Sequence, residues 1–295
     1  MKKILISGGT GFIGRHAIPF LVKQGYEIHV LQRHFSDSSS REGAYFHVIP
    51  EDAAKFISLL TNIKPDGIIH LATLFQASHK PEQIENMISA NVTLGSMLLE
   101  AASKLHSVWF LNTGTYWQHI NAQQYNPVNL YAATKQAFET IAVYYYQNYP
   151  INFLTLCLND TYGPHDSRPK IFNLWKKQLS SDSYLDMTAG EQILDVLYIS
   201  DVLDAIKKCI FLLEEDNSQK LKGKIFFATA EEKYTLRETA AIFEQISGKN
   251  LRINWGAKPY RPKEIMVPEC FGTPIPDWHS QVTLKQGIRK FLNDD

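Results

Sequence analysis

The sequence predicts an α/β fold in which a doubly wound parallel sheet is followed by a smaller α+β part. Short apolar runs alternate with segments of helical period through the first 165 residues, a pattern typical of βαβ crossovers. After Gly163-Pro164 the pattern loosens into short elements separated by prolines. We therefore expect a first domain at residues 1–165, to which the chain returns at about 193–228, and a second domain made mainly of residues 166–295.

The elements expected in the first domain follow one another closely. The first strand is Ile4–Ile6, and a helix runs from the glycine-rich turn after it to about Gly25. Further strands are predicted at 27–32, 45–49, 68–72, 107–112 and 151–158, and helices at 84–104 and 131–149. Continuous apolar strands such as the one at 68–72 are typical of a parallel sheet covered on both faces. Strands at 196–199 and 225–228 are expected later in the chain.

Composition excludes several classes of protein. The chain has 295 residues, 44% of them hydrophobic, so disorder is excluded. Thirty Lys and Arg residues balance thirty Asp and Glu residues, which argues against a nucleic acid or an anionic membrane as partner. Three scattered cysteines predict neither a metal site nor a disulfide framework, and no apolar run has the length of a signal peptide or a membrane span. We expect a cytoplasmic protein.

A glycine-rich turn follows the first strand. Gly8, Gly11 and Gly14 are spaced three apart and open the first helix, a context in which backbone N–H groups and the helix N-terminus hold a pyrophosphate. The alternative is a turn that only packs the helix on the strand. The predicted cofactor contacts in this turn are Gly8, Thr10, Gly11, Phe12, Ile13 and Gly14.

The Gly-x-x-Gly-x-x-Gly spacing resembles that of the extended short-chain dehydrogenase/reductases, the NAD-dependent epimerase/dehydratase family. The resemblance covers most of the chain and includes the segments 70–72, 131–135, 162–164 and 197–202, together with Asn91. It implies a Rossmann domain, a substrate-binding domain and a nicotinamide cofactor contacted by Leu71, Ala72 and Asn91. It also implies a homodimer, because helices near 91–105 and 131–148 commonly pair two subunits in this family.

The end of the second strand bears on the choice of cofactor. An acidic residue there accepts hydrogen bonds from the adenosine ribose, whereas a basic residue accommodates a 2′-phosphate. Gln32 stands at the acidic position and Arg33 follows it, which favours NADP(H). NAD(H) is the alternative, since Arg33 would then be an ordinary surface residue.

Three residues form the expected catalytic group. Tyr131 and Lys135 lie four apart on a helix, so they share one face, and a cation beside a tyrosine lowers its pKa toward ambient pH. The resemblance implies that Lys135 also holds the nicotinamide ribose. It further implies a hydroxyl at the end of the strand 107–112, for which we choose Thr113 and keep Thr115 as the rival.

The residues after Thr113 bear on the reaction. Dehydratases of this family carry Asp-Glu there, but this chain has Gly114-Thr115, which disfavours dehydration. A reductase needs only the three residues above. Two alternatives remain, a 4-epimerase with tightly bound NAD and a non-catalytic NADP-sensing regulator, although the intact Tyr131 and Lys135 argue against the latter.

Longer stretches at 112–119, 126–135 and 160–170 resemble the nucleotide-sugar 4-ketoreductases that make dideoxyhexoses, the group of the CDP-abequose and CDP-paratose synthases. This resemblance implies NADPH-dependent reduction at C4 of a CDP-linked 4-keto-6-deoxyhexose for surface polysaccharide such as lipopolysaccharide O-antigen, with Tyr131 as proton donor. Asp160 replaces an asparagine that contacts the nucleotide sugar in relatives. The predicted substrate contacts are Thr115, Trp117, His119, Asp160, Arg168 and Arg261, the two arginines being candidates for the diphosphate.

Overall fold

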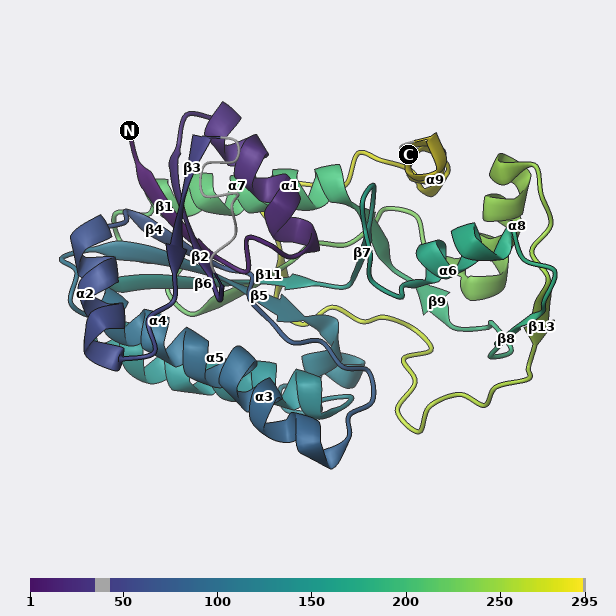
Figure 1. Ribbon diagram of the computed structural model, residues 1–295, viewed down its shortest axis with the longest axis horizontal. Coiled ribbons are helices and arrows are strands. Elements are labelled where there is room, and N and C mark those ends of the chain that lie inside the picture. The colour runs from purple at the N-terminus through teal and green to yellow at the C-terminus, as the bar shows by residue number, and fades with distance from the viewer. Residues whose placement is uncertain (35–42, 294–295) are drawn as a thin grey trace.

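The computed structural model describes residues 1–34 and 43–293 and confirms the predicted fold class. Within these residues one sheet has eight strands, all parallel, in the order β14-β11-β6-β5-β4-β1-β2-β3 (Figure 1). The strands are β1 (Lys3–Ser7), β2 (Glu27–Gln32), β3 (Ala44–Val48), β4 (Gly67–His70), β5 (Val108–Thr115), β6 (Ile151–Leu158), β11 (Lys224–Phe227) and β14 (Thr273–Pro274).

Helices cover both faces of the sheet. α1 (Phe12–Lys23) and α7 (Ile199–Glu215) lie on one face, and α2 (Ala53–Ile63), α3 (Ile84–Ile88), α4 (Leu94–Ala102) and α5 (Leu130–Asn148) lie on the other (Figure 1). Successive strand residues alternate between two apolar cores: Ile4 and Ile6 pack with α1 and α7, whereas Leu5 packs with α2 and α4. Because both faces are buried, polar side chains are confined mainly to the strand ends.

The C-terminal part is built from short elements. Its helices are α6 (Ile171–Gln178), α8 (Leu236–Ser247) and α9 (Leu284–Asn293). Its small sheets pair β7 (Asp160–Tyr162) with β10 (Val196–Tyr198), β9 (Ile193–Leu194) with β12 (Tyr234–Thr235), and β8 (Leu185–Met187) with β13 (Ile253–Trp255). Thus 193–198 pairs outside the large sheet, while α7, β11 and β14 lie on or in it. The domain boundaries themselves stay a prediction.

Most predicted elements agree with the structure to within two residues, α2 was not predicted, and two elements near the candidate site differ more. The helix expected at 84–104 is divided by a π-helical turn, Ser89–Thr93, which separates α3 from α4. β5 continues three residues beyond the expected end at Asn112, because Thr113, Gly114 and Thr115 still pair with β6. The extension carries both candidate threonines within the sheet.

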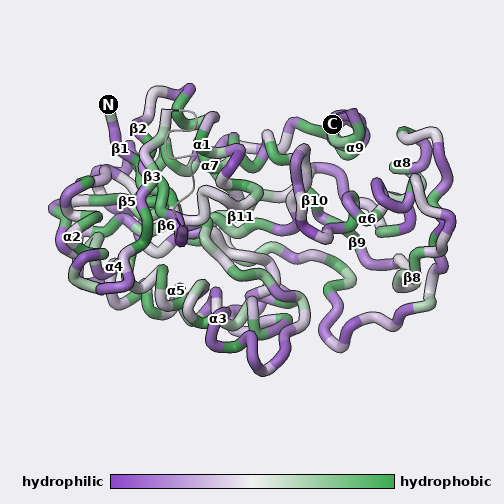
Figure 2. The backbone as a smooth tube through the Cα atoms, in the orientation of Figure 1, coloured by the Kyte–Doolittle hydropathy of each residue, from purple (hydrophilic) through white to green (hydrophobic). Residues whose placement is uncertain are grey.

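Hydrophobic segments are concentrated in the strands and in the helices packed on them, and hydrophilic segments lie mostly in outer loops (Figure 2). Of the helices in the described parts of the chain, none has both the length and the apolar character needed to cross a lipid bilayer.

Candidate functional site

Polar residues meet where β1, β4 and β5 end. Ser7 Oγ and His70 Nδ1 lie 2.6 Å apart, and Thr113 donates from Oγ1 to the carbonyl oxygen of His70 at 2.9 Å. Burial lowers the pKa of His70 to about 3, and the charge of Lys135 adds to this effect. His70 is therefore a neutral residue that joins the three strand ends.

The glycine turn after β1 has no room for side chains. Gly8 has φ +77°, and a Cβ there would lie 2.6 Å from the carbonyl carbon of Leu71, next to Ala72. A Cβ on Gly14 would lie 2.7 Å from the carbonyl carbon of Gly9. Since Gly11 is the N-cap of α1 and has no side chain, the first N–H groups of the helix are left for an anion. These features fit a dinucleotide pyrophosphate.

The end of β2 lies at the same edge of the sheet. Gln32 is buried and Arg33 is exposed directly after it. The position is compatible with the ribose end of a dinucleotide that crosses this edge, while the choice between NADP and NAD stays a prediction.

Asn91 fastens the loop after β4 to α5. Its Oδ1 accepts from Thr73 Oγ1 at 3.0 Å and from Leu74 N at 2.7 Å. Its Nδ2 donates to Leu74 O at 3.2 Å and to Thr134 Oγ1 at 2.9 Å. The π-helical turn presents Asn91 to both neighbours at once, so its observed contacts position the loop beside Tyr131.

Tyr131 and Lys135 lie one turn apart on α5, and both are buried. Burial raises the pKa of Tyr131 to about 12, opposed by hydrogen bonding with Thr73. Burial lowers the pKa of Lys135 to about 8, opposed by the charges of Glu139 and Cys157. The pair therefore offers a protonated phenol beside an amine that titrates close to physiological pH.

The two candidate threonines have different hydrogen bonds. The Thr115 hydroxyl caps the 3₁₀ turn Tyr116–Gln118 by accepting from Trp117 N at 3.4 Å. The Thr113 hydroxyl instead rests on the last carbonyl of β4. The single proton of Thr113 is thus engaged by His70 and the hydroxyl of Thr115 is an acceptor, and the choice of Thr113 over Thr115 as the catalytic hydroxyl stays a prediction.

An aromatic wall, formed by the contacting rings of Phe75, Trp117 and Tyr131, lies beside Lys170 and Arg261. The Phe75 ring centroid lies 5.0 Å from that of Tyr131, edge to face, and 5.6 Å from that of Trp117. Lys170 Nζ lies 4.5 Å from the Phe75 centroid, and Arg261 Cζ lies 5.4 Å from the Trp117 centroid. Sequence reasoning missed Phe75, whose one signal is an aromatic side chain in the loop after β4.

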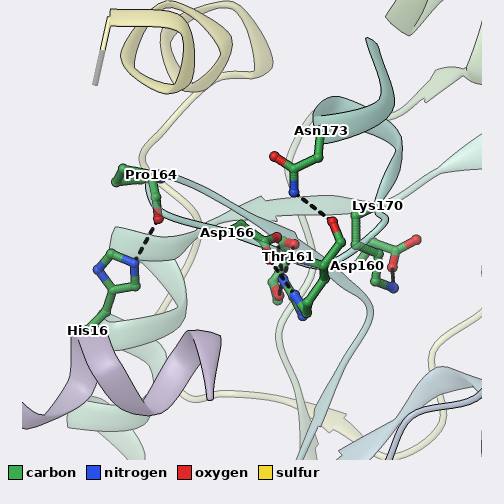
Figure 3. Close-up of polar contacts among 8 residues, drawn as sticks. His16, Asp160, Thr161, Pro164, Asp166, Lys170 and Asn173 are labelled. Carbon is green, nitrogen blue, oxygen red and sulfur yellow. Dashed lines mark hydrogen bonds and ion pairs between the residues drawn. The ribbon is translucent and has the colours of Figure 1, made fainter. Parts of the chain in front are cut away.

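Cations gather around Asp160. Lys170 Nζ lies 2.6 Å from Asp160 Oδ1 (Figure 3). Burial raises the pKa of Asp160, but the charges of Lys170, Arg168 and Arg261 outweigh burial and lower it below its ordinary value. Asp160 therefore favours its ionised form and pairs directly with Lys170. Arg261 is the more exposed arginine, with Nε 3.6 Å from Glu264 Oε2.

The two parts of the chain meet at α1. The guanidinium of Arg168 binds Asp166 through Nε and Nη2, both at 2.8 Å, and lies 4.3 Å from the centroid of the Phe12 ring. His16 Nε2 contacts the carbonyl oxygen of Pro164 at 3.1 Å (Figure 3). The glycine turn and the segment 164–168 therefore share one packed contact.

His119 lies at a separate pocket. Its Nδ1 contacts the carbonyl oxygens of Gln123 and Gln124 at 3.1 Å each, and its ring stacks on Phe271 with centroids 4.1 Å apart. The pocket has a volume of about 230 Å³ and is also lined by Glu139. The structure thus brings His119 beside Glu139, and its role as a sugar contact stays a prediction.

The fold and this site define a class of protein, and comparison confirms it. Residues 4–225 match the NAD dependent epimerase/dehydratase family, and the chain belongs to that family. The prediction of an enzyme that uses a nicotinamide dinucleotide is thereby confirmed.

Among particular proteins, the chain is similar to two CDP-abequose synthases. It is 32% identical to that of Salmonella typhimurium, with 98% of this chain and 97% of the relative covered. It is 28% identical to that of Salmonella muenchen, with 99% and 97% covered.

Solved structures confirm the fold. UDP-glucuronic acid 4-epimerase from Bacillus cereus, in complex with UDP-glucuronic acid and NAD, superposes with a TM-score of 0.81 at 20% identity, covering 99% of this chain and 98% of that one. UDP-glucose 4-epimerase from Thermotoga maritima, with UDP-glucose, gives 0.80 at 18% identity, covering 98% and 97%.

Gly14→Ala is expected to weaken dinucleotide binding at least about tenfold, because overpacking of a close backbone contact costs about 1–3 kcal/mol. Calorimetric titration with NADPH and NADH measures the change. Gly25→Asn is the control at the other end of α1, where asparagine tolerates the positive φ of 89°. Unchanged affinity in Gly14→Ala would contradict the placement of the pyrophosphate.

Lys135→Met is expected to raise the free energy of unfolding by about 1–3 kcal/mol at pH 7 while abolishing turnover. The folded-state pKa of about 8 lies below the ordinary 10.5, so the unfolded chain binds more protons between these values. The destabilisation is complete below pH 8 and is lost as the pH rises through 10.5. Urea unfolding at several pH values measures it, with exposed Lys104→Met as control. Equal stability of Lys135→Met and wild type at pH 7 would contradict the burial of a charged lysine.

Proposed function

We propose that the protein is an NADPH-dependent reductase that acts at C4 of a nucleotide-diphospho-4-keto-6-deoxyhexose, with CDP as the nucleotide. The observation that carries the proposal is the buried pair of Tyr131 and Lys135 on one face of α5, with no acid or base at Gly114 and Thr115 for eliminating water. The nearly full-length similarity to CDP-abequose synthases supports a nucleotide-sugar substrate. Such a product serves the synthesis of surface polysaccharide, including lipopolysaccharide O-antigen.

Each side chain has a separate role in the reduction of the carbonyl group. The bound dinucleotide supplies a hydride to the carbonyl carbon. Tyr131, protonated at all physiological pH values, gives its proton to the oxygen. The hydroxyl of Thr113 donates to the carbonyl oxygen of His70 in this structure, and it would turn its proton to the substrate oxygen once substrate is bound. The ammonium of Lys135 stabilises the phenolate that remains. One hydride and one proton convert the ketone into an alcohol.

The cleft offers separate surfaces for the sugar and the diphosphate. The aromatic wall provides an apolar face for the deoxyhexose ring next to Tyr131. Arg261 is half-exposed near Trp117 and is our first choice for the diphosphate. Arg168 is the second choice, since it already binds Asp166 and Thr161. Asp160 would act by holding these cations rather than by contacting the sugar.

A 4-epimerase with retained NAD is the second candidate. The same three residues suffice for it, and the observation in its favour is Gln32 at the end of β2, a neutral side chain that is compatible with NAD, whereas Arg33 argues against it. The nucleotide sugars and NAD in the solved epimerase structures belong to those proteins. The two candidates differ in one measurable respect, because only the reductase consumes NADPH.

We also infer a homodimer formed through the helices that cover one face of the sheet. Ile84 and Ile88 of α3 and Tyr144 of α5 are 38%, 43% and 57% exposed. Apolar side chains gathered on neighbouring helices favour association with a second copy. Sedimentation at micromolar concentration measures the state.

The reductase is expected to consume NADPH with a CDP-4-keto-6-deoxyhexose and to leave UDP-hexoses unchanged. Absorbance loss on incubation with CDP-, dTDP-, UDP- and GDP-linked 4-keto-6-deoxyhexoses measures this, and repetition with NADH tests the role of Arg33. Interconversion of a UDP-hexose without NADPH consumption would establish the epimerase instead. Preference for NADH would contradict the role of Arg33.

Thr113→Val is expected to lower kcat by about 10²-fold, since one hydrogen-bond donor to a developing oxyanion contributes that much. Thr115→Val is the matched control two residues away and should keep kcat within about threefold, because its hydroxyl contributes only a local cap worth about 1 kcal/mol. Steady-state kinetics of both variants measures the difference. The reverse order would assign the hydroxyl to Thr115.

A further inference from the structure

Glu139 is a buried carboxyl group one helical turn beyond Lys135. Tyr131, Lys135 and Glu139 follow at intervals of four on α5, so they lie along one face of the helix. Asn112 donates to Glu139 Oε1 at 3.3 Å and to Thr155 Oγ1 at 3.2 Å. The mechanism above uses Tyr131 and Lys135 but leaves Glu139 without a role.

On the side of Gly114, the residues around Glu139 leave room for its carboxyl group and for little else. A Cβ on Gly114 would lie 3.2 Å from Glu139 Oε1 and 2.9 Å from Thr155 Cγ2, so a side chain there would press on the carboxyl. Asn112 Oδ1 is buried without a hydrogen-bond partner among the described residues. An ordered water beside Glu139 is the group that would satisfy this oxygen.

Glu139 is buried, but it also faces a pocket. It lines the pocket of about 230 Å³, which has room for several waters. Thr140 and Tyr125 line the same pocket and are exposed. The pocket is therefore a route from solvent to Glu139 that does not pass the aromatic wall, on which the sugar would lie.

Each reduction removes a proton from Tyr131, and the tyrosine must regain one before the next turnover. We propose that Glu139 is a positioning residue that returns this proton, passing it from water in the pocket to Lys135 and through Lys135 to Tyr131. This inference rests on the proposed reductase. The balance is as follows. Lys135 gives a proton to the Tyr131 phenolate, the carboxylate of Glu139 takes one proton from bulk solvent through water in the pocket, and Glu139 passes that proton to the neutral amine of Lys135, so each turnover takes up one proton from solvent.

The electrostatics agree with this path. Burial raises the pKa of Glu139, opposed by hydrogen bonding with Gln118 and Thr155 and by the charge of Lys135, so the carboxyl carries a proton at higher pH than an exposed glutamate. Side chains one turn apart on a helix have Cβ atoms about 5–6 Å apart, within reach through one water. The titratable groups around Glu139 and Lys135 are His70, His119, Tyr125, Tyr146 and Cys157.

The test is the kinetics of Glu139→Gln, which keeps the size of the side chain and one acceptor oxygen for Asn112 but cannot relay a proton. In stopped flow, the first turnover of NADPH should match wild type, because Tyr131 starts protonated, and later turnovers should slow by about 10²-fold. Formate should restore the later turnovers of Glu139→Ala through the pocket. Thr140→Val lines the same pocket and should behave as wild type. Equal slowing of first and later turnovers, or no slowing, would overturn the relay.

A second measurement does not depend on the substrate. NMR titration of ¹³C-labelled lysine, assigned with Lys135→Arg, should show a lower pKa for Lys135 in Glu139→Gln than in wild type, since the carboxylate attracts the ammonium. An unchanged pKa would overturn the coupling of the two residues. A wild-type protein that never consumes NADPH would refute the proposed function. The titration would then still show whether Glu139 and Lys135 are electrostatically coupled.

Discussion

The parallel direction of every strand in the large sheet is the constraint on which the site depends. Each strand must be followed by a crossover that covers a face, so both faces are apolar and polar groups collect at the carboxyl ends. Ser7 and His70 end β1 and β4, Thr113 lies two residues before the end of the adjacent β5, and both Ser7 and Thr113 are hydrogen-bonded to His70. The glycine turn closes on the same edge against Leu71. The proposed cofactor cradle and the proposed catalytic group are thus consequences of one alignment.

Burial at this edge sets the chemistry of the ionisable groups. His70 is held neutral, Lys135 is brought toward neutral pH, and Glu139 is moved toward its protonated form, in each case mainly by desolvation. Asp160 is the opposite case, because three cations overcome its desolvation. A chain with no net charge therefore holds two local environments of different character, one poor in charge around Lys135 and one rich in charge around Asp160.

Strands and the catalytic helix could be predicted from sequence because their apolar patterns are local. The strands 27–32 and 151–158 have the expected bounds, and α5 differs from its prediction by one residue at each end. The break at Ser89–Thr93 was missed because a π-helical turn keeps a helical pattern, and it depends on partners of Asn91 distant in sequence. The end of β5 was missed because pairing with β6 outweighs the polar character of Thr113 to Thr115.

In the candidate site, too, residues with a local sequence pattern could be predicted, and residues that depend on contacts distant in sequence could not. Tyr131, Lys135 and the glycines follow from spacing alone, and Glu139 could have been found by extending that spacing one turn further. Phe75 could not, because its contacts with Tyr131 and Trp117 join three separate segments. Arg168 was chosen for its charge, whereas its observed partners, Asp166 and Phe12, depend on the folded loop.

The contact of Phe12 with Arg168, together with that of His16 with Pro164, limits how freely the two parts of the chain can be exchanged. Rossmann domains are often treated as interchangeable cofactor modules. Here the first turns of α1 carry the anion-binding end of the helix on one side and support the segment 164–168 on the other. A chimera that imports the N-terminal domain of a relative must therefore import matching residues at 164–168, or the transplanted module will bind its cofactor beside a misplaced substrate loop.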